Sequence, residues 1–323
     1  MSLALELPVL IGGLAVIWWA GDKSVRYATE SAEILGITGF TTGFIIMSVS
    51  TGMPEISTAI ISMLNNSAEL SVGNILGSNL VNLTLVLGIA AIAANHMKIN
   101  KEHESSLVKI MVLITAVTGL IFVTGSLNPL HGFLLLATYV GAIIWLQKGG
   151  LMDKIMKEEQ EEAEDELEEE AFSGPYATFA KLIGSTALVI IGAELTVGSA
   201  IEIGKIIDVP LEVIGATAVA IGTGLPELSL ELNAVKKREY GLALGNVFGS
   251  VLVNFTLVLG MMSVFSPVSI NVNALIHLLP FLGASLALIW YTVLREHEIS
   301  REVGLALILF FILYLFEEIG FIL

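Results

Sequence analysis

The sequence contains no cysteine and few charged residues. Only 14% of its 323 residues are charged, whereas a soluble domain carries about 25%. The absence of cysteine excludes disulfides, thiolate metal sites and thiol catalysis. The sequence has no basic patch, which excludes nucleic acid as an expected partner. It also has no H-E-x-x-H or nucleophile motif, so we do not expect an enzyme.

Apolar residues make up 55% of the chain, and its mean hydropathy is +0.84. Apolar runs near membrane-spanning length recur about every thirty residues, so the lipid bilayer is the expected partner. The sequence therefore predicts an all-α membrane protein with about ten transmembrane helices. The predicted spans are 4–21, 38–64, 70–95, 107–125, 128–147, 182–204, 211–235, 241–266, 271–294 and 303–322.

The basic residues indicate an orientation. When the loops between the predicted spans are numbered in chain order, odd-numbered and even-numbered loops lie on opposite sides of the membrane. Every Lys and Arg except Lys205 lies in or beside an odd-numbered loop. Basic residues gather on the cytoplasmic side of membrane proteins. We therefore expect a multi-pass protein of the cell (plasma) membrane with both termini outside and the central loop in the cytoplasm.

That central loop is strongly acidic, with eleven Asp and Glu residues between Asp153 and Glu170. A solvated linker explains this composition, and so does a cytoplasmic segment that collects cations. The sequence alone does not separate these two interpretations, and it does not indicate the oligomeric state.

The most informative feature is an internal repeat. TGMPEIS at 51–57 returns as TGLPELS at 223–229, and GNILGSNLVNLTLVLG at 73–88 returns as GNVFGSVLVNFTLVLG at 245–260. A constant offset of 172 residues, the separation of Glu55 from Glu227, relates the copies without a gap.

The spacing of the copies predicts their topology. They begin at predicted helices one and six, and an odd separation makes the second copy enter the membrane from the opposite face. We predict two inverted-topology five-helix repeats at 1–147 and 178–323, joined by the acidic cytoplasmic loop at 148–177. A substrate site is expected near the midplane between them.

Each copy places a carboxylate in the middle of a predicted membrane helix, where an ionisable group is costly and marks a functional site. A proline directly before it breaks the helix and frees the carbonyl four residues earlier, because proline has no N–H. The predicted ligands are the carboxylates of Glu55 and Glu227, the freed carbonyls of Ser50 and Gly222, and the hydroxyls of Thr51 and Thr223.

Matched polar residues follow in predicted helices three and eight. Asn, Ser and Asn recur at i, i+4 and i+8, which places them along one helix face. One copy alone is typical of helix packing, but two copies opposite two matched carboxylates indicate a binding site. Glu231 has Ala59 in place of a counterpart, so it is not predicted to belong to this site. The matched positions are Asn74, Ser78 and Asn82 in the first copy and Asn246, Ser250 and Asn254 in the second.

Oxygen ligands without His or Cys favour Ca2+, Mg2+ or Mn2+ over Zn2+ or Cu2+. Two glutamates neutralise one divalent cation, and two protons or several Na+ can replace it. Exchange follows from this balance, because an empty pair of charged carboxylates is costly in a low dielectric. We predict Ca2+ as the transported cation, with Mn2+ left open.

The paired TG-PE and GN--GS---N segments resemble the two alpha repeats of the calcium/cation antiporter superfamily, especially its sodium/calcium exchanger branch. The likeness extends over nearly all ten predicted helices. It implies two inverted five-helix halves and alternating access, in which helices one and six slide across the core. It further implies that Glu55 and Glu227 bind calcium. The other positions that match the family's ligands are Thr51, Thr223, Ser78, Asn82, Ser250 and Asn254.

Two departures from that family bear on the counter-ion. Sodium/calcium exchangers usually have Ser at the positions of Gly52 and Gly224, and some have Asp at the position of Asn254. Fewer oxygen ligands for a monovalent cation favour H+, although the motifs of the calcium/proton branch are not present. The sequence thus predicts a Ca2+ antiporter driven by H+, with a Na+/Ca2+ exchanger as the alternative.

Two other classes of protein compete with an antiporter. A divalent cation channel assembles its filter from rings of groups around an axis, which one chain with an inverted repeat does not indicate. An intramembrane enzyme could use Glu55 and Glu227 as acid and base. A channel would carry current without counter-ion flux, and an enzyme would turn over a substrate in detergent.

Overall fold

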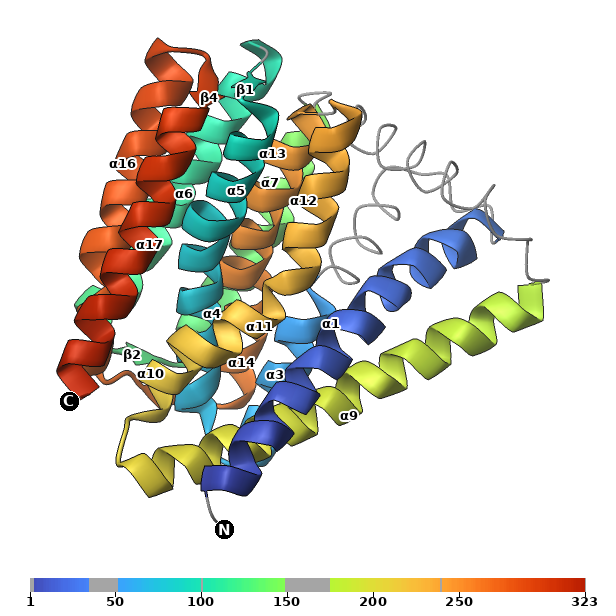
Figure 1. Cartoon of the computed structure of the whole chain (residues 1–323), viewed down its shortest axis with the longest axis vertical. Helices are drawn as coiled ribbons and strands as arrows, with labels where there is room; N and C mark the ends of the chain where they lie inside the picture. The colour runs from blue at the N-terminus through green and yellow to red at the C-terminus, as the bar shows by residue number, and fades with distance from the viewer. Residues whose placement is uncertain (1–2, 35–51, 100, 149–174, 239, 323) are drawn as a thin grey trace.

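The computed structural model describes residues 3–34, 52–99, 101–148, 175–238 and 240–322, which are mostly helical (Figure 1). The first part contains α1 (Leu3–Ile34), α3 (Met53–Leu64), α4 (Ala68–Val81), the π-helix η1 (Asn82–Val86), α5 (Leu87–Ala94), β1 (His96–Lys98), α6 (Lys101–Thr124), β2 (Ser126–Leu127) and α7 (Pro129–Lys148). The second part contains α9 (Pro175–Ile207), α10 (Leu211–Ile214), the π-helix η2 (Gly215–Val219), α11 (Ala220–Thr223), α12 (Leu225–Lys237), α13 (Tyr240–Val253), the π-helix η3 (Asn254–Val258), α14 (Leu259–Phe265), β3 (Val268–Ser269), α15 (Val272–Leu275), α16 (Leu278–Arg295), β4 (Glu298–Ser300) and α17 (Arg301–Ile322).

Several of these helices are suited to a bilayer. Among the described residues, six are long and apolar enough to cross a membrane, and three shorter apolar helices also fall at predicted spans. The six are Leu3–Ser24, Ala68–Ala94, Tyr176–Ile207, Leu211–Lys236, Ala243–Phe265 and Leu278–Arg295. The chain is therefore a membrane protein built from apolar helices.

Two helix boundaries differ from the prediction. We expected helix one to end near residue 21, where its apolar run ends, but α1 continues to Ile34. The added turns pack along α9, where the Thr178 hydroxyl donates to Glu30 Oε1 at 2.6 Å. Predicted helix nine is also interrupted, because α15 ends at Leu275 and α16 begins at Leu278.

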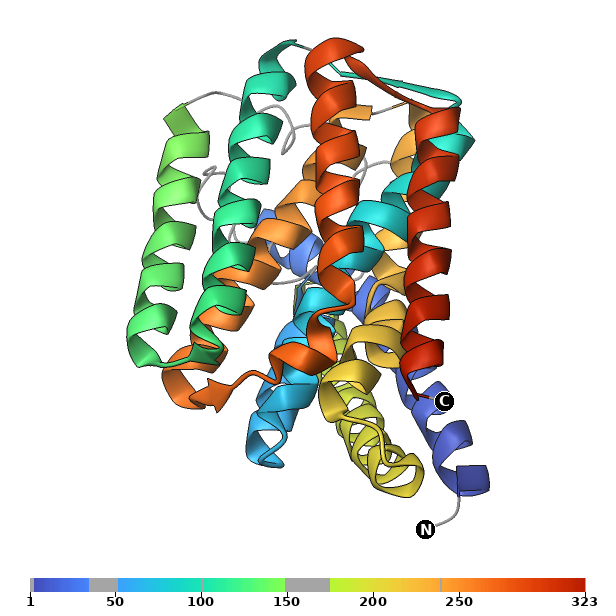
Figure 2. The same cartoon turned by 90° about the vertical axis from the view of Figure 1, so that its left-hand side faces the viewer.

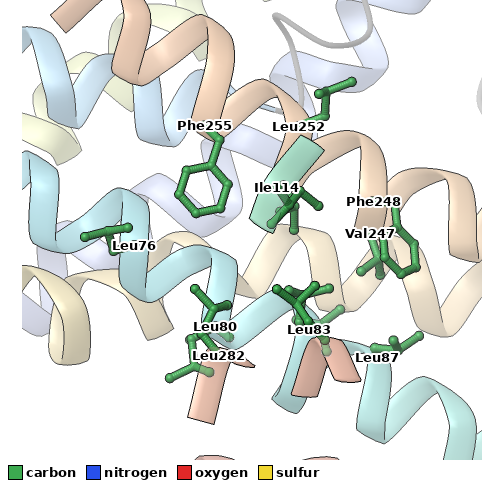
Figure 3. Close-up of a cluster of buried hydrophobic side chains, with 14 of the residues drawn as sticks. Leu76, Leu80, Leu83, Leu87, Ile114, Val247, Phe248, Leu252, Phe255 and Leu282 are labelled. Atoms are coloured by element: carbon green, nitrogen blue, oxygen red, sulfur yellow. The ribbon is translucent and has the colours of Figure 1, made fainter. Parts of the chain in front are cut away.

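The centre of the molecule is formed by the two helices that carry the longer repeat motif. Nearly every side chain of α4 is buried, including the polar side chains of Asn74, Ser78 and Asn79. Other helices therefore enclose α4 on all sides. In Figure 3, Leu76 and Leu80 of α4 and Leu83 of η1 lie in one cluster with Phe248 of α13 and Phe255 of η3. The packed core therefore lies between the two copies of the repeat.

Two short antiparallel ladders tie the two parts of the chain together. Strand β1 pairs with β4, with Met97 opposite Ile299, and β2 pairs with β3, with Leu127 opposite Val268. The repeat offset relates β1 to β3 and β2 to β4, so the two ladders are equivalent. They lie at opposite ends of the molecule (Figure 1).

Helices α1 and α9 lie side by side, run in opposite directions and cross the outside of the bundle obliquely (Figure 1). Their backbones meet at Gly13 and Gly192, where an added Cβ on either residue would lie 3.0 Å from the carbonyl oxygen of the other. Small residues permit this close crossing. Viewed from the side, α6 and α7 lie at the opposite edge of the bundle from α17 (Figure 2).

Candidate functional site

The two matched carboxylates lie at two matched helix starts. Gly52 precedes α3 and Gly224 precedes α12, and each helix has proline in its first turn. Proline is tolerated there because the first N–H groups of a helix have no intrahelical partner. Glu55 and Glu227 thus stand in the first turn of their helices, where the helix dipole favours negative charge.

Both carboxylates are removed from solvent. Glu55 is 1% exposed and Glu227 is 3% exposed. Neither oxygen of Glu55, nor Oε2 of Glu227, has a hydrogen-bond partner among the described residues. Buried polar groups are almost always paired, so three carboxylate oxygens are available to a cation.

A hydroxyl and amide cluster lies across the junction of the two parts. The Thr223 hydroxyl of α11 donates to Asn74 Oδ1 at 3.2 Å, and the Ser78 Oγ lies 3.2 Å from Thr223 Oγ1. All three side chains are fully buried. The predicted ligands Ser78 and Thr223 therefore lie in contact, although their positions are not equivalent in the repeat.

A second hydrogen bond crosses the junction between the two halves at the predicted ligand Asn254. Asn254 Nδ2 donates to Asn79 Oδ1 at 3.3 Å, joining η3 to α4. The amide of Asn82 is 1% exposed, and neither its nitrogen nor its oxygen has a partner among the described side chains and backbone. The hydroxyl of Ser250 is likewise buried without one. These neutral oxygens are suitable ligands for a hard cation.

Both copies contain a π-helical turn at the same place. Asn82 begins η1 and Asn254 begins η3. Directly beyond, the Thr84 hydroxyl donates to Leu80 O at 2.5 Å, and the Thr256 hydroxyl donates to the equivalent carbonyl at 2.6 Å. Such hydroxyl bonds bend helices, and single π-helical turns are frequent at functional sites. The repeat thus preserves a local distortion beside each asparagine.

Helix α1 passes directly over the two helix starts. A Cβ added to Gly21 would lie 3.5 Å from Pro54 Cγ and 3.7 Å from Pro226 Cγ. One turn earlier, the Trp18 Nε1 donates to Ser229 Oγ at 3.4 Å. A movement of α1 along its axis would therefore change contacts with both halves of the site.

The predicted residues are brought together in part. Ser50 and Thr51 lie outside the described residues. Gly222 is buried against Leu14 of α1. Its carbonyl was predicted to be freed by Pro226, but it accepts a backbone N–H where α11 ends. The remaining predicted ligands, all buried, are Glu55, Glu227, Thr223, Ser78, Asn82, Ser250 and Asn254.

Sequence reasoning did not single out two buried polar residues. Asn79 was overlooked because its repeat counterpart is the apolar Val251. Glu231 was set aside because its counterpart is Ala59, but it is 0% exposed and accepts a hydrogen bond from Asn246. A polar residue within an apolar run was the available signal in both cases.

Comparison with known proteins places these features in a family. The model of the family described as "Sodium/calcium exchanger protein" matches residues 5–147 and 178–319. The chain is 27% identical to the inner membrane protein YrbG of Escherichia coli, over 83% of this chain and 82% of that protein. It is also 27% identical to the sodium/calcium exchanger MaX1 of Methanosarcina acetivorans, over 95% of this chain and 96% of that protein.

A solved structure shares the fold. The sodium-calcium exchanger NCX_Mj, soaked with Na+ and Sr2+, superposes with a TM-score of 0.64 at 24% identity, over 97% of this chain and 99% of that one. The family match covers both copies of the repeat and leaves out only the acidic loop and the chain ends. The chain therefore belongs to the sodium/calcium exchanger protein family, within the calcium/cation antiporters.

Proposed function

We propose that this chain is a secondary active antiporter that exchanges Ca2+ against H+ by alternating access. The observation that carries the proposal is the pair of buried carboxylates, Glu55 and Glu227, whose oxygens have unused hydrogen-bonding capacity. Each stands in the first turn of a helix that has proline at its start, one in each copy of the repeat. Two carboxylates from opposite halves match the charge of one divalent cation.

The proposed architecture is two inverted five-helix halves, residues 1–147 and 178–323, joined by the acidic loop 148–177. The equivalent ladders at opposite ends of the molecule support this inversion, as do the opposite directions of α1 and α9 (Figure 1). Inverted repeats place the substrate between the halves near the bilayer midplane.

We propose that the Ca2+ ligands are oxygens of both halves. Ca2+ accepts six to eight oxygens in flexible geometry, which suits a mixture of carboxylates, amides, hydroxyls and backbone carbonyls. The described side chains include two charged and several neutral candidate ligands. The proposal also includes Ser50 and Thr51, which lie outside the described residues. The full proposed set is Glu55, Glu227, Thr51, Thr223, the carbonyls of Ser50 and Gly222, Ser78, Asn82, Ser250 and Asn254.

The surroundings of Gly224 support a proton as the counter-ion. A Cβ at this position would lie 3.0 Å from Val81 Cγ1 and 3.2 Å from Ala220 O, so an apolar side chain occupies the space beside it. A proton needs only one carboxylate oxygen, whereas Na+ needs several. Na+ is the second candidate, because the relative from Methanosarcina acetivorans is named a sodium/calcium exchanger.

The distribution of basic residues between the two ends of the molecule supports an orientation in the membrane. Lys98, Arg295 and Arg301 lie at the end that carries the β1–β4 ladder, whereas Lys205 lies near the end of α9, at the other end (Figure 1). We propose that the β1–β4 end faces the cytoplasm. Both chain termini then lie outside the cell, in a multi-pass protein of the plasma membrane.

The proposal predicts proton-driven Ca2+ uptake. Radioactive Ca2+ uptake into proteoliposomes is measured with an imposed proton gradient and, in parallel, with an imposed Na+ gradient. We expect uptake with the proton gradient and little with Na+. Uptake with Na+ alone would assign the chain to Na+ coupling. Ca2+ current without counter-ion flux would indicate a channel, and uptake with neither gradient would contradict exchange.

A further inference from the structure

Three buried hydroxyls of the first half are not part of the proposed Ca2+ site. Thr58 and Ser62 of α3 and Ser71 of α4 are each 0% exposed. None of the three hydroxyl oxygens has a hydrogen-bond partner among the described residues. Buried side-chain oxygens are rarely left without a partner. These three residues, which we name the hydroxyl file, therefore require an explanation.

Other buried hydroxyls of the helices behave differently. Four of them donate to the carbonyl oxygen four residues earlier, at distances between 2.5 and 2.8 Å: Thr84, Thr118, Thr256 and Ser263. Such a bond satisfies a hydroxyl within its own helix. The same bond is open to Thr58 and Ser62, because α3 includes the residues four positions before them. Neither of these two hydroxyls forms it.

The hydroxyl file leads away from the exchange site. Glu55, Thr58 and Ser62 are spaced at i, i+3 and i+7, so they share one face of α3. Helices α3 and α4 form an antiparallel hairpin, and the N–H of Ser67 in its turn donates to the Ser62 carbonyl at 2.8 Å. Ser62 lies in the last turn of α3 and Ser71 in the first turn of α4, so the hairpin places them at about the same depth.

The far end of the file lies close to the surface. Leu64, two residues beyond Ser62, is 72% exposed, and Asn65 and Asn66 in the turn are also exposed. This turn is at the end opposite the β1–β4 ladder, because α4, η1 and α5 run from it to β1. Figure 2 shows the hairpin, in light blue, reaching the end at which the N-terminus lies. In the proposed orientation, this end faces the outside of the cell.

The second half of the molecule has no equivalent file. The repeat offset places Leu230, Ala234 and Ala243 at the positions of the three hydroxyl residues. Two of them, Ala234 and Ala243, belong to the buried apolar core. The repeat retains the proposed Ca2+ ligands in both halves, so Ca2+ binding does not explain hydroxyls that occur in one half only. The file is thus a specific feature of the outer side.

The chemistry of the file suits a proton. Ca2+ requires six to eight oxygens, whereas each of these buried side chains offers one neutral oxygen. A hydroxyl both accepts and donates a hydrogen bond, so it can receive a proton on one side and release another on the opposite side. Side chains one helical turn apart are separated by about 6 Å, a distance that one bridging water molecule spans.

We propose that Thr58, Ser62 and Ser71 form the route along which protons pass between the outer surface and the exchange site. When Ca2+ leaves to the outside, the protons that replace it arrive along this route, and they return along it in the reverse direction. This inference rests on the proposed exchange of Ca2+ against H+ and adds the path of the counter-ion on the outer side.

The test compares two modes of exchange in proteoliposomes. Proton-driven Ca2+ uptake requires the route, whereas exchange of radioactive for unlabelled Ca2+ at equal pH on both sides does not. Each variant loses one hydrogen bond to a passing positive charge, so Thr58→Val and Ser62→Ala should slow the first mode about 10- to 100-fold. The second mode should stay unchanged. Thr58→Ser retains a hydroxyl and should retain the wild-type rate.

Matched controls remove buried hydroxyls elsewhere. Thr118→Val and Ser263→Ala each delete a hydroxyl that is bonded within its own helix, and both modes should proceed as in the wild type. Wild-type proton-driven uptake in Thr58→Val, or equal slowing of both modes, would overturn this inference and leave the proposed function standing. Absence of proton-driven uptake in the wild type would contradict the proposed function itself.

Stability and binding measurements cover a variant that does not transport. The Thr58 and Ser62 hydroxyls form no hydrogen bond with the described residues, so their removal should lower neither the unfolding temperature nor the affinity for Ca2+. Thr118→Val loses a hydrogen bond and should unfold at a lower temperature. Inactive Thr58→Val with wild-type stability and Ca2+ binding would support the route. A lower unfolding temperature or weaker Ca2+ binding would assign the hydroxyl to packing or to the Ca2+ site and contradict it.

Discussion

Replacing Glu55 or Glu227 by glutamine is expected to abolish measurable Ca2+ uptake. Each substitution removes one of two charges that face the cation in a dry environment, and it leaves the remaining carboxylate with an excess positive charge beside it. Removing one partner of a buried charge pair costs about 2 to 5 kcal/mol, so Ca2+ affinity should fall between about 30-fold and several thousand-fold. Uptake of radioactive Ca2+ and equilibrium binding to purified protein measure the two effects.

The aspartate variants provide the graded control. Glu55→Asp and Glu227→Asp keep the charge but withdraw it by one methylene, so binding should weaken without being lost. The exposed Glu302→Gln removes the same charge far from the site and should leave uptake unchanged. If either glutamine variant binds Ca2+ as tightly as the wild-type protein, that carboxylate is not a ligand.

The repeat explains why so much of the site could be predicted from the sequence. Polar residues that recur in apolar runs predicted Ser78, Asn82, Ser250 and Asn254, and all four are buried at the centre of the structure. The apolar runs similarly predicted the positions of the six described helices that are long and apolar enough to cross a membrane. The repeat identifies which polar residues occur in both halves, but it does not indicate which of them are in contact.

The contacts themselves could not be predicted from the repeat. Thr223 meets Ser78 and Asn74, and Asn254 meets Asn79, in both cases across the junction between the halves. These pairs depend on how the helices cross in space, which the offset along the chain does not specify. Residues present in one half only lack the repeat signal altogether. Glu231 was set aside for that reason, and the structure shows that it is buried and accepts a hydrogen bond from Asn246.

The end of α1 illustrates a second limit. Hydropathy falls after residue 21, yet the helix continues to Ile34 because its polar turns pack against α9. Tertiary packing supplies most of the stability of a helix, and a hydropathy window does not detect it. Hydropathy therefore predicted the apolar part of α1 but not the residue at which the helix ends.

The second large effect concerns the glycines of α4. An added Cβ on Gly73 would overlap the carbonyl oxygen of Glu212, and one on Gly77 would overlap that of Ala216. In return, a Cβ on Gly215 would lie 2.7 Å from the Asn74 backbone nitrogen. Since these neighbours are backbone atoms, they cannot turn aside as a flexible side chain can. Helix α4 thus approaches α10 and η2 this closely because Gly73, Gly77 and Gly215 have no Cβ at the contact.

We therefore expect Gly77→Val to separate α4 from η2 and destabilise the protein strongly. Overpacking a core commonly costs about 1–3 kcal/mol, and a clash with backbone on this scale should cost more. Separation would also withdraw Ser78 and Asn74 from Thr223, so Ca2+ binding should fall together with stability. Thermal unfolding in detergent and Ca2+ binding at low temperature measure both. Gly119→Val is the matched control, because a Cβ there has no neighbour within 4 Å. Equal unfolding temperatures for the two variants would show that α4 and η2 do not require this close approach.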